Sequence, residues 1–124
     1  MRARIQAFFR RKPAAAKAAG KPEMKILRDG ETLSVSDIRE LVAVNGKSFH
    51  LQLSAALPAN VRHIDIDLSQ TRMDCGGVGA LVALRNWARQ QNRDVAIRLL
   101  NPTHPVRRLF HLTRMDEVFP IERE

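Results

Sequence analysis

The sequence predicts a small α/β domain, with a mixed β-sheet of about four to five strands and helices mainly on one face. Three observations lead to this prediction. Strand-like and helix-like segments alternate in the order ββαβαβαβ, and each strand-like segment has a single apolar face. The chain of 124 residues, 44% of them apolar, is long enough for one modest core, and no apolar run is long enough to span a bilayer.

The first half of the predicted domain contains two strands and a helix. The strands are placed at residues 32–35 and 40–44, and an Asn-Gly dipeptide marks a turn after the second. Ser48 is the expected N-cap of a helix over residues 49–57, which the following proline would end.

Two patterns define the centre of the chain. The run HIDIDLS (residues 63–69) alternates strictly, so Ile64, Ile66 and Leu68 are expected on a covered face and the polar residues on a wetter one. A helix is expected over residues 77–91. Five of its side chains follow the spacing of a buried stripe: Ala80, Leu81, Leu84, Trp87 and Ala88.

The last part of the chain predicts a strand, a helix and a short final strand. The run DVAIRLL (residues 94–100) is strand-like, and its inward-facing side chains are expected to be Val95, Ile97 and Leu99. A helix follows, with Thr103 as its cap and Pro105 in its first turn. Its buried side chains are expected to be Val106, Leu109 and Phe110. Residues 118–121 are the expected final strand.

The positive charge of the chain is concentrated in its first part. The net charge is +8, but residues 1–25 hold eight basic residues and one acidic residue, whereas the rest holds 13 basic and 12 acidic residues. This nearly neutral remainder argues against a nucleic-acid partner. Residues 1–23 are therefore predicted to be a basic, disordered tail, and residues 24–124 the folded domain.

The start of the tail leaves a second interpretation open. Ile5, Phe8 and Phe9 have the spacing of one helical face and are surrounded by arginines. Residues 1–12 could therefore form a short amphipathic helix that contacts an anionic membrane surface or a partner, rather than a tail that only adds solubility. The single cysteine of the chain excludes an internal disulfide and predicts a reducing, cytoplasmic location.

The segment RMDCGGVGAL (residues 72–81) is the strongest candidate for chemistry, but it fits no catalytic or cofactor-binding motif. A Walker-type phosphate loop needs Lys-Ser or Lys-Thr after its last glycine, and Gly79 is followed by Ala-Leu. The dinucleotide fingerprint needs a glycine where the chain has Val82. Cys75 lacks a second cysteine, and no arginine follows it until Arg85. Neither a cofactor nor a catalytic cysteine is expected.

The histidines and acidic pairs do not predict a catalytic or metal site either. His50, His63, His104 and His111 are expected on four different elements without the spacing of metal ligands. The two aspartates of HIDIDLS are expected on the solvated side of a strand. The chain is therefore predicted not to be an enzyme.

Three segments together carry a resemblance to a known family. They are the strand that ends in Asp-Leu-Ser (residues 67–69), the Asp-x-x-Gly-x-Gly turn that begins at Asp74, and the closing segment NPTHPVRRLFHLTRMDEVF (residues 101–119). The chain resembles the STAS domains, the family of anti-sigma-factor antagonists and of the cytoplasmic tails of sulfate transporters, over roughly residues 31–121. The closing segment is especially similar to bacterial antagonists.

The resemblance implies a function in partner switching. In that family, a free antagonist binds an anti-sigma factor that is also a serine kinase, and phosphorylation of the antagonist breaks the complex until a phosphatase resets it. The phosphoacceptor position falls at Cys75, with the motif's aspartate at Asp74 and its turn glycine at Gly77. A phosphate there would add nearly two negative charges beside a carboxylate and repel a complementary partner.

The cysteine is the consequential departure from the family pattern. A serine kinase does not phosphorylate a thiol in the usual way, and Gly76 adds no hydroxyl. Ser69 and Thr71 are nearby stand-ins, although both precede the aspartate. A separate hypothesis is a redox sensor, in which oxidation of Cys75 to a sulfinate mimics phosphate.

The partner surface is predicted at the turn and along the following helix. The turn contributes Asp74, Cys75, Gly76 and Gly77. An apolar and basic ridge at helical spacing continues from it through Val78, Val82, Arg85 and Arg89. The alternative is that the valines complete the core and the arginines are merely solvated.

Two kinds of partner follow from the resemblance. The first is an anti-sigma factor with serine-kinase character, with a cognate phosphatase where one exists. The second is the ATPase of a bacterial ABC-type lipid transporter, because some of these transporters have a small separate STAS subunit whose turn can lack serine and carry paired glycines.

Overall fold

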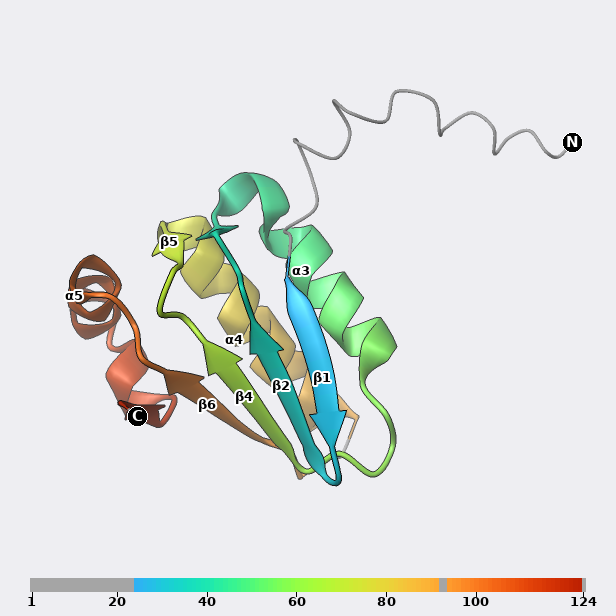
Figure 1. Ribbon diagram of the computed structural model, residues 1–124. Coiled ribbons are helices and arrows are strands. Elements are labelled where there is room, and N and C mark those ends of the chain that lie inside the picture. The colour runs from blue at the N-terminus through green and yellow to red at the C-terminus, as the bar shows by residue number, and fades with distance from the viewer. Residues whose placement is uncertain (1–23, 92–93, 124) are drawn as a thin grey trace, which may run out of the picture.

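A computed structural model describes residues 24–91 and 94–123 of the chain (Figure 1). Within these residues, the main sheet has five strands in the order β1-β2-β4-β6-β7. They are Lys25–Asp29 (β1), Thr32–Ser36 (β2), His63–Asp67 (β4), Ala96–Leu100 (β6) and Ile121–Glu122 (β7). β1 is antiparallel to β2 and all other neighbours are parallel, so the sheet is mixed, as the sequence predicts.

Two further short strands and three helices complete the described part of the chain. β3 (Glu40–Leu41) and β5 (Arg72–Met73) form a separate parallel pair. The helices are α3 (Ala43–Ala56), α4 (Cys75–Gln90) and α5 (His104–Leu112), and a 3₁₀ turn follows at Met115–Glu117. Helices α3 and α4 lie side by side on one face of the sheet, and α5 lies beyond its β6 side (Figure 1). No helix in residues 24–91 or 94–123 combines the length and the apolar character that a membrane span requires.

The two faces of the sheet have different chemistry. Toward the helices, the strands bury aliphatic side chains, among them Leu33, Val35, Ile64, Ile66, Ile97 and Leu99. On the other face, Arg98 donates to both carboxylate oxygens of Asp65 at 2.9 and 2.8 Å and to Glu122 at 3.0 Å. The alternation predicted for HIDIDLS is thus confirmed, since its apolar residues are fully buried and its aspartates are only partly exposed.

Helix α3 differs most from the prediction. It begins at Ala43, so residues 42–44 are not strand, Asn45 and Gly46 are not a turn, and Ser48 is not a cap. The buried side chain of Asn45 explains the earlier start, because its amide oxygen accepts from the Val42 amide at 2.9 Å and its amide nitrogen donates to the Glu40 carbonyl at 3.1 Å. These hydrogen bonds stabilise a helix start that the β-branched valines disfavour.

The remaining predicted elements are present with shifted ends. Helix α4 begins two residues before the expected position, and β6 begins two residues after its expected position. The final strand β7 is Ile121–Glu122, so the prediction of strand at residues 118–120 is wrong. The buried stripe of α4 is confirmed for Ala80, Leu81, Leu84 and Ala88, while Trp87 is half-buried. β1 and β5 were not predicted. The predicted tail at residues 1–23, including the apolar face at 1–12, lies outside the described residues.

Candidate protein-binding site

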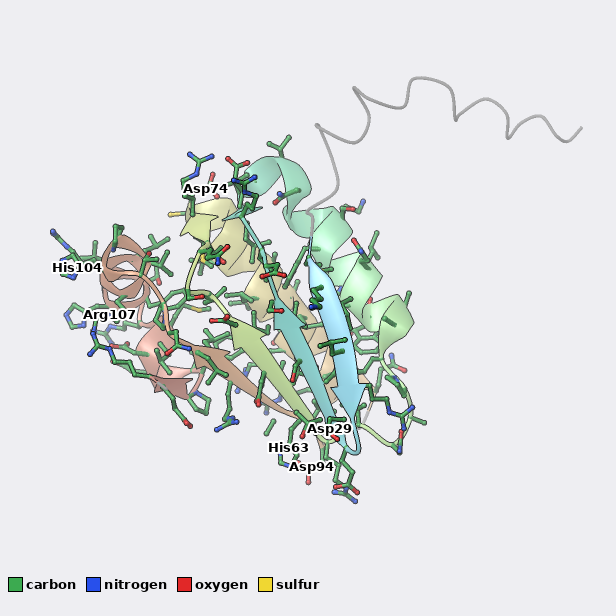
Figure 2. The ribbon with its side chains drawn as sticks, in the orientation of Figure 1. Asp29, His63, Asp74, Asp94, His104 and Arg107 are labelled. Carbon is green, nitrogen blue, oxygen red and sulfur yellow. The ribbon has the colours of Figure 1, made fainter. Side chains whose placement is uncertain are left out.

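Two helices begin next to each other at one end of the molecule. β3 leads into α3 and β5 leads into α4, and the two strands pair in parallel through Leu41 and Met73. An ion pair between Arg72 and Glu40 joins the strands at the surface. Figure 2 shows Asp74 at this end of the sheet, opposite to the end that carries Asp29, His63 and Asp94.

The Asp74 carboxylate contacts both helices. One oxygen accepts from the amide of Gly77 at 3.1 Å, which makes Asp74 the N-cap of α4. The other oxygen is 3.4 Å from the amide of Ala43, the first residue of α3. Aspartate is a preferred cap because its carboxylate satisfies amides that have no partner within the helix. Here one side chain serves the N-termini of two helices, although Asp74 and Ala43 are 31 residues apart in sequence.

The paired glycines of the turn allow close packing. A Cβ atom on Gly77 would lie 1.9 Å from the carbonyl oxygen of Leu41, and one on Gly76 would lie 2.4 Å from the Cα of Ala43. Across the same interface, a Cβ on Gly46 would lie 3.1 Å from the carbonyl oxygen of Gly76. These glycines let α4 approach β3 and α3. Gly79 differs, because a Cβ there would have no neighbour within 4 Å.

The exposed residues at this end include the predicted acceptor position. Cys75 is the first residue of α4 and is exposed. The two stand-in hydroxyls differ in access: Thr71 is 2% exposed and donates to the Ile38 carbonyl at 2.6 Å, whereas Ser69 is exposed and donates to Asp67 at 3.2 Å. The Thr71 hydroxyl therefore stabilises the fold and is not accessible to a kinase in the folded domain.

The predicted ridge on α4 is only partly on the surface. Gly77 is buried, Val78 belongs to the core and Val82 is partly buried against it. Arg85 is half-buried and Arg89 is exposed. The apolar half of the ridge is thus used for packing, as the alternative interpretation states. Helical spacing predicts that these four residues share one flank of α4, but spacing alone does not show how wide the buried arc is.

Helix α3 supplies a part of the site that the sequence reasoning missed. Val44, in its first turn, is 67% exposed. A shallow groove of about 300 Å³ runs between the two helices, which we call the α3/α4 groove. Its lining residues are Ala43, Gly46, Lys47, His50, Gly76, Gly79, Ala80 and Ala83. The small residues at helical spacing on α4 are a sequence signal for the α4 side of the groove. The α3 residues that line the groove can be identified only from the way the two helices pack.

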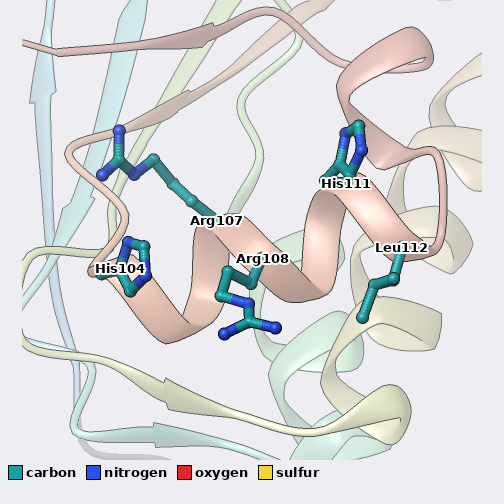
Figure 3. A pocket seen from close by; sticks show the side chains of 5 residues that line it. All are labelled: His104, Arg107, Arg108, His111 and Leu112. Atoms are coloured by element: carbon teal, nitrogen blue, oxygen red, sulfur yellow. The ribbon is translucent and has the colours of Figure 1, made fainter.

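A second hollow, of about 390 Å³, lies on α5 (Figure 3). One face of this helix lines it with His104, Arg107, Arg108, His111 and Leu112. The prediction that the four histidines lie on four elements is therefore wrong, since His104 and His111 share α5. His111 lies 3.4 Å from Asp116. Among the described residues, no group of three or more His, Cys, Asp or Glu side chains is placed to hold a metal ion.

Comparisons with known proteins agree with this architecture. The family model described as "Mlab, STAS domain" matches residues 28–121. Among solved structures, a chain from "Structure of the Anti-Sigma Factor Antagonist SpoIIAA in its Unphosphorylated Form" is similar, with a TM-score of 0.60 and 19% identity, over 82% of this chain and 88% of that chain. At this identity the similarity shows the fold alone. No curated protein matches the sequence.

Proposed function

Because the chain belongs to the STAS domain family, we propose that it is a non-enzymatic regulatory module that binds a partner protein through the adjacent N-termini of α3 and α4. The single observation that carries the proposal is the surface at this end. It combines exposed Val44, Cys75 and Gly79 with the fixed carboxylate of Asp74. A rigid surface of small and apolar side chains suits a protein partner, because little conformational entropy is lost when it binds.

The proposed partner is a cytoplasmic anti-sigma factor with serine-kinase character. The resemblance of residues 101–119 to bacterial antagonists supports this choice, as does the fold shared with an anti-sigma factor antagonist. Binding would liberate a sigma factor. With Cys75 at the acceptor position, phosphorylation there would not end the complex, so the module would bind constitutively or take its input from the partner.

Disruption of the surface should weaken partner binding. Gly79→Arg places a long cationic side chain at the mouth of the α3/α4 groove, where the backbone has open space, so the fold is retained. We expect affinity for the captured partner to fall about tenfold or more, since a bulky charge in the centre of an interface excludes close contact. Affinity capture from the native cell, mass spectrometry and titration of the purified partner measure this effect.

A matched control is available on the same helix. Asn86→Arg adds the same side chain to the exposed face of α4, two turns further from Asp74. Its affinity should stay within about twofold of the parent value, as is usual for a change outside an interface. Equal losses in both variants, or none in Gly79→Arg, would contradict the proposed surface.

A second variant tests the acceptor position. Cys75→Ser places a hydroxyl on the exposed first residue of α4, next to Asp74. Where the partner is a serine kinase, we expect this variant to gain one phosphate, detected by intact-mass spectrometry, and then to release the partner. If an active cognate kinase leaves the serine unmodified, the chain has lost recognition by the kinase as well as the acceptor hydroxyl.

A second candidate partner is the ATPase of an ABC-type lipid transporter. The sequence of the turn favours it, because Cys75, Gly76 and Gly77 lack a hydroxyl and include paired glycines, the pattern that the resemblance associates with such transporter subunits. The capture experiment separates the two candidates. Recovery of a transporter ATPase in place of an anti-sigma kinase would overturn the first candidate and leave the binding surface itself supported.

A further inference from the structure

Within the described residues, the β1 edge of the main sheet has no neighbouring strand. β1 pairs with β2 on one side, and no other strand in the described part of the chain pairs with its outer side (Figure 1). Leu27, at the centre of β1, is 55% exposed. Because β1 pairs with β2 so that Ile26 and Arg28 lie opposite the core residues Val35 and Leu33, Leu27 faces the helix-free side of the sheet.

The backbone groups of β1 alternate between its two edges. The amide of His63 donates to the carbonyl of Glu31 at 3.1 Å. In β2, the odd-numbered residues therefore direct their backbone groups to β4, and the even-numbered ones direct theirs to β1. The even-numbered residues pair with Lys25, Leu27 and Asp29. The backbone groups of Ile26 and Arg28 are consequently directed to the open edge, where a further strand would bind them.

The sequence of β1, Lys-Ile-Leu-Arg-Asp, is complementary to itself when it is read antiparallel. If two copies pair about a twofold axis at Leu27, Ile26 lies opposite Arg28 of the second copy, and these two residues exchange the free backbone hydrogen bonds. Lys25 of each copy lies opposite Asp29 of the other, which gives two such pairs. Both pairs lie on the same face as the two Leu27 side chains. Within the described residues, neither Lys25 nor Asp29 forms an ion pair in the single chain.

We propose that two copies of this chain associate through β1, antiparallel and centred on Leu27, to form one sheet across both molecules. Charge complementarity selects the register, since centring the pair on Arg28 would oppose two like charges. Charged residues often protect an edge strand from pairing. In β1, however, their order makes pairing with a second copy favourable. The interface is small, so the association is weak and needs measurement up to on the order of 0.5 mM protein.

Charge exchange tests the proposal with the full chain. Lys25→Asp opposes two carboxylates across the interface, and Asp29→Lys opposes two ammonium groups. We expect each single variant to raise the dimer dissociation constant about tenfold or more in sedimentation equilibrium. The double variant Lys25→Asp/Asp29→Lys restores both pairs, so its dissociation constant should return to within about threefold of the parent value.

Mixing provides the decisive measurement. An equimolar mixture of the two single variants pairs each carboxylate with an ammonium group, and should form a heterodimer at concentrations where each variant alone is expected to be mainly monomeric. The control Arg108→Asp makes the same charge change at an exposed position of α5, beyond the opposite side of the sheet, and should leave association unchanged. A monomeric parent at the highest concentration, or a dimer that neither single variant weakens, would overturn the proposal. Circular dichroism of each variant verifies folding, which substitutions at exposed edge positions should not alter.

Discussion

Gly77→Ala is expected to lower the free energy of unfolding by about 3 kcal/mol, the upper part of the range for overpacking. The new methyl group would lie 1.9 Å from the Leu41 carbonyl oxygen and 2.6 Å from the Met73 Cγ. The Met73 side chain can move, but the carbonyl belongs to β3, which is held by its pairing with β5. Relief of the clash therefore requires α4 to move away from the β3–β5 pair. Urea denaturation followed by circular dichroism measures the change.

The matched control has the opposite expected sign. Gly79→Ala adds the same methyl group two residues further along α4, where nothing lies within 4 Å. We expect it to raise the free energy of unfolding by about 0.5–1 kcal/mol, because glycine inside a helix loses more backbone entropy on folding than alanine does. If both variants changed stability in the same direction, the close approach of α4 to β3 would not be as described.

Asp74→Ala should have the next largest effect on stability, a loss of about 2 kcal/mol, at the upper end of the range for helix caps. The estimate is high because the carboxylate serves two helices, through the Gly77 amide at 3.1 Å and the Ala43 amide at 3.4 Å. Thermal and urea unfolding measure the loss. A cost under about 0.5 kcal/mol would show that solvent satisfies these amides equally well.

Asp74→Asn separates the geometry of the cap from its charge. Asparagine is as good a cap as aspartate but offers one oxygen in place of two. We therefore expect it to keep the Gly77 contact, lose the Ala43 contact, and cost about 1 kcal/mol or less. A loss equal to that of Asp74→Ala would mean that the negative charge, and not the hydrogen bond to α4, stabilises this end of the domain.

The parts of the fold that the sequence predicted well are those with strong local periodicity. The alternation in HIDIDLS and the buried stripe of α4 are both found in the structure, because one covered face imposes its period on a strand or a helix. β1 carries no such signal, since four of its five residues are exposed at the sheet edge. The early start of α3 depends on hydrogen bonds of the Asn45 side chain. Residue propensities alone assign this asparagine to a turn.

Of the two helices that form the candidate site, the sequence located the residues of α4 but not those of α3. The Asp-x-x-Gly-x-Gly pattern located Asp74, Cys75 and the glycines, all of which lie at the start of α4. It could not locate Val44 or Lys47, because their position beside α4 results from the packing of two helices that begin 32 residues apart. For Val78, the limit was different. The residue lies where the helix surface meets the core, and its 9% exposure follows from the shape of the neighbouring elements.

The contact of Asp74 with two helices also sets the electrostatic state of this end of the domain. The aligned peptide dipoles of each helix place about half a positive charge at its N-terminus, and two such termini lie here. The single negative charge of the carboxylate approximately cancels their sum. The charge of Asp74 and the two helix termini together is therefore small, and the exposed Lys47 adds one positive charge beside them. One phosphate on the first residue of α4 would shift this balance by nearly two charges.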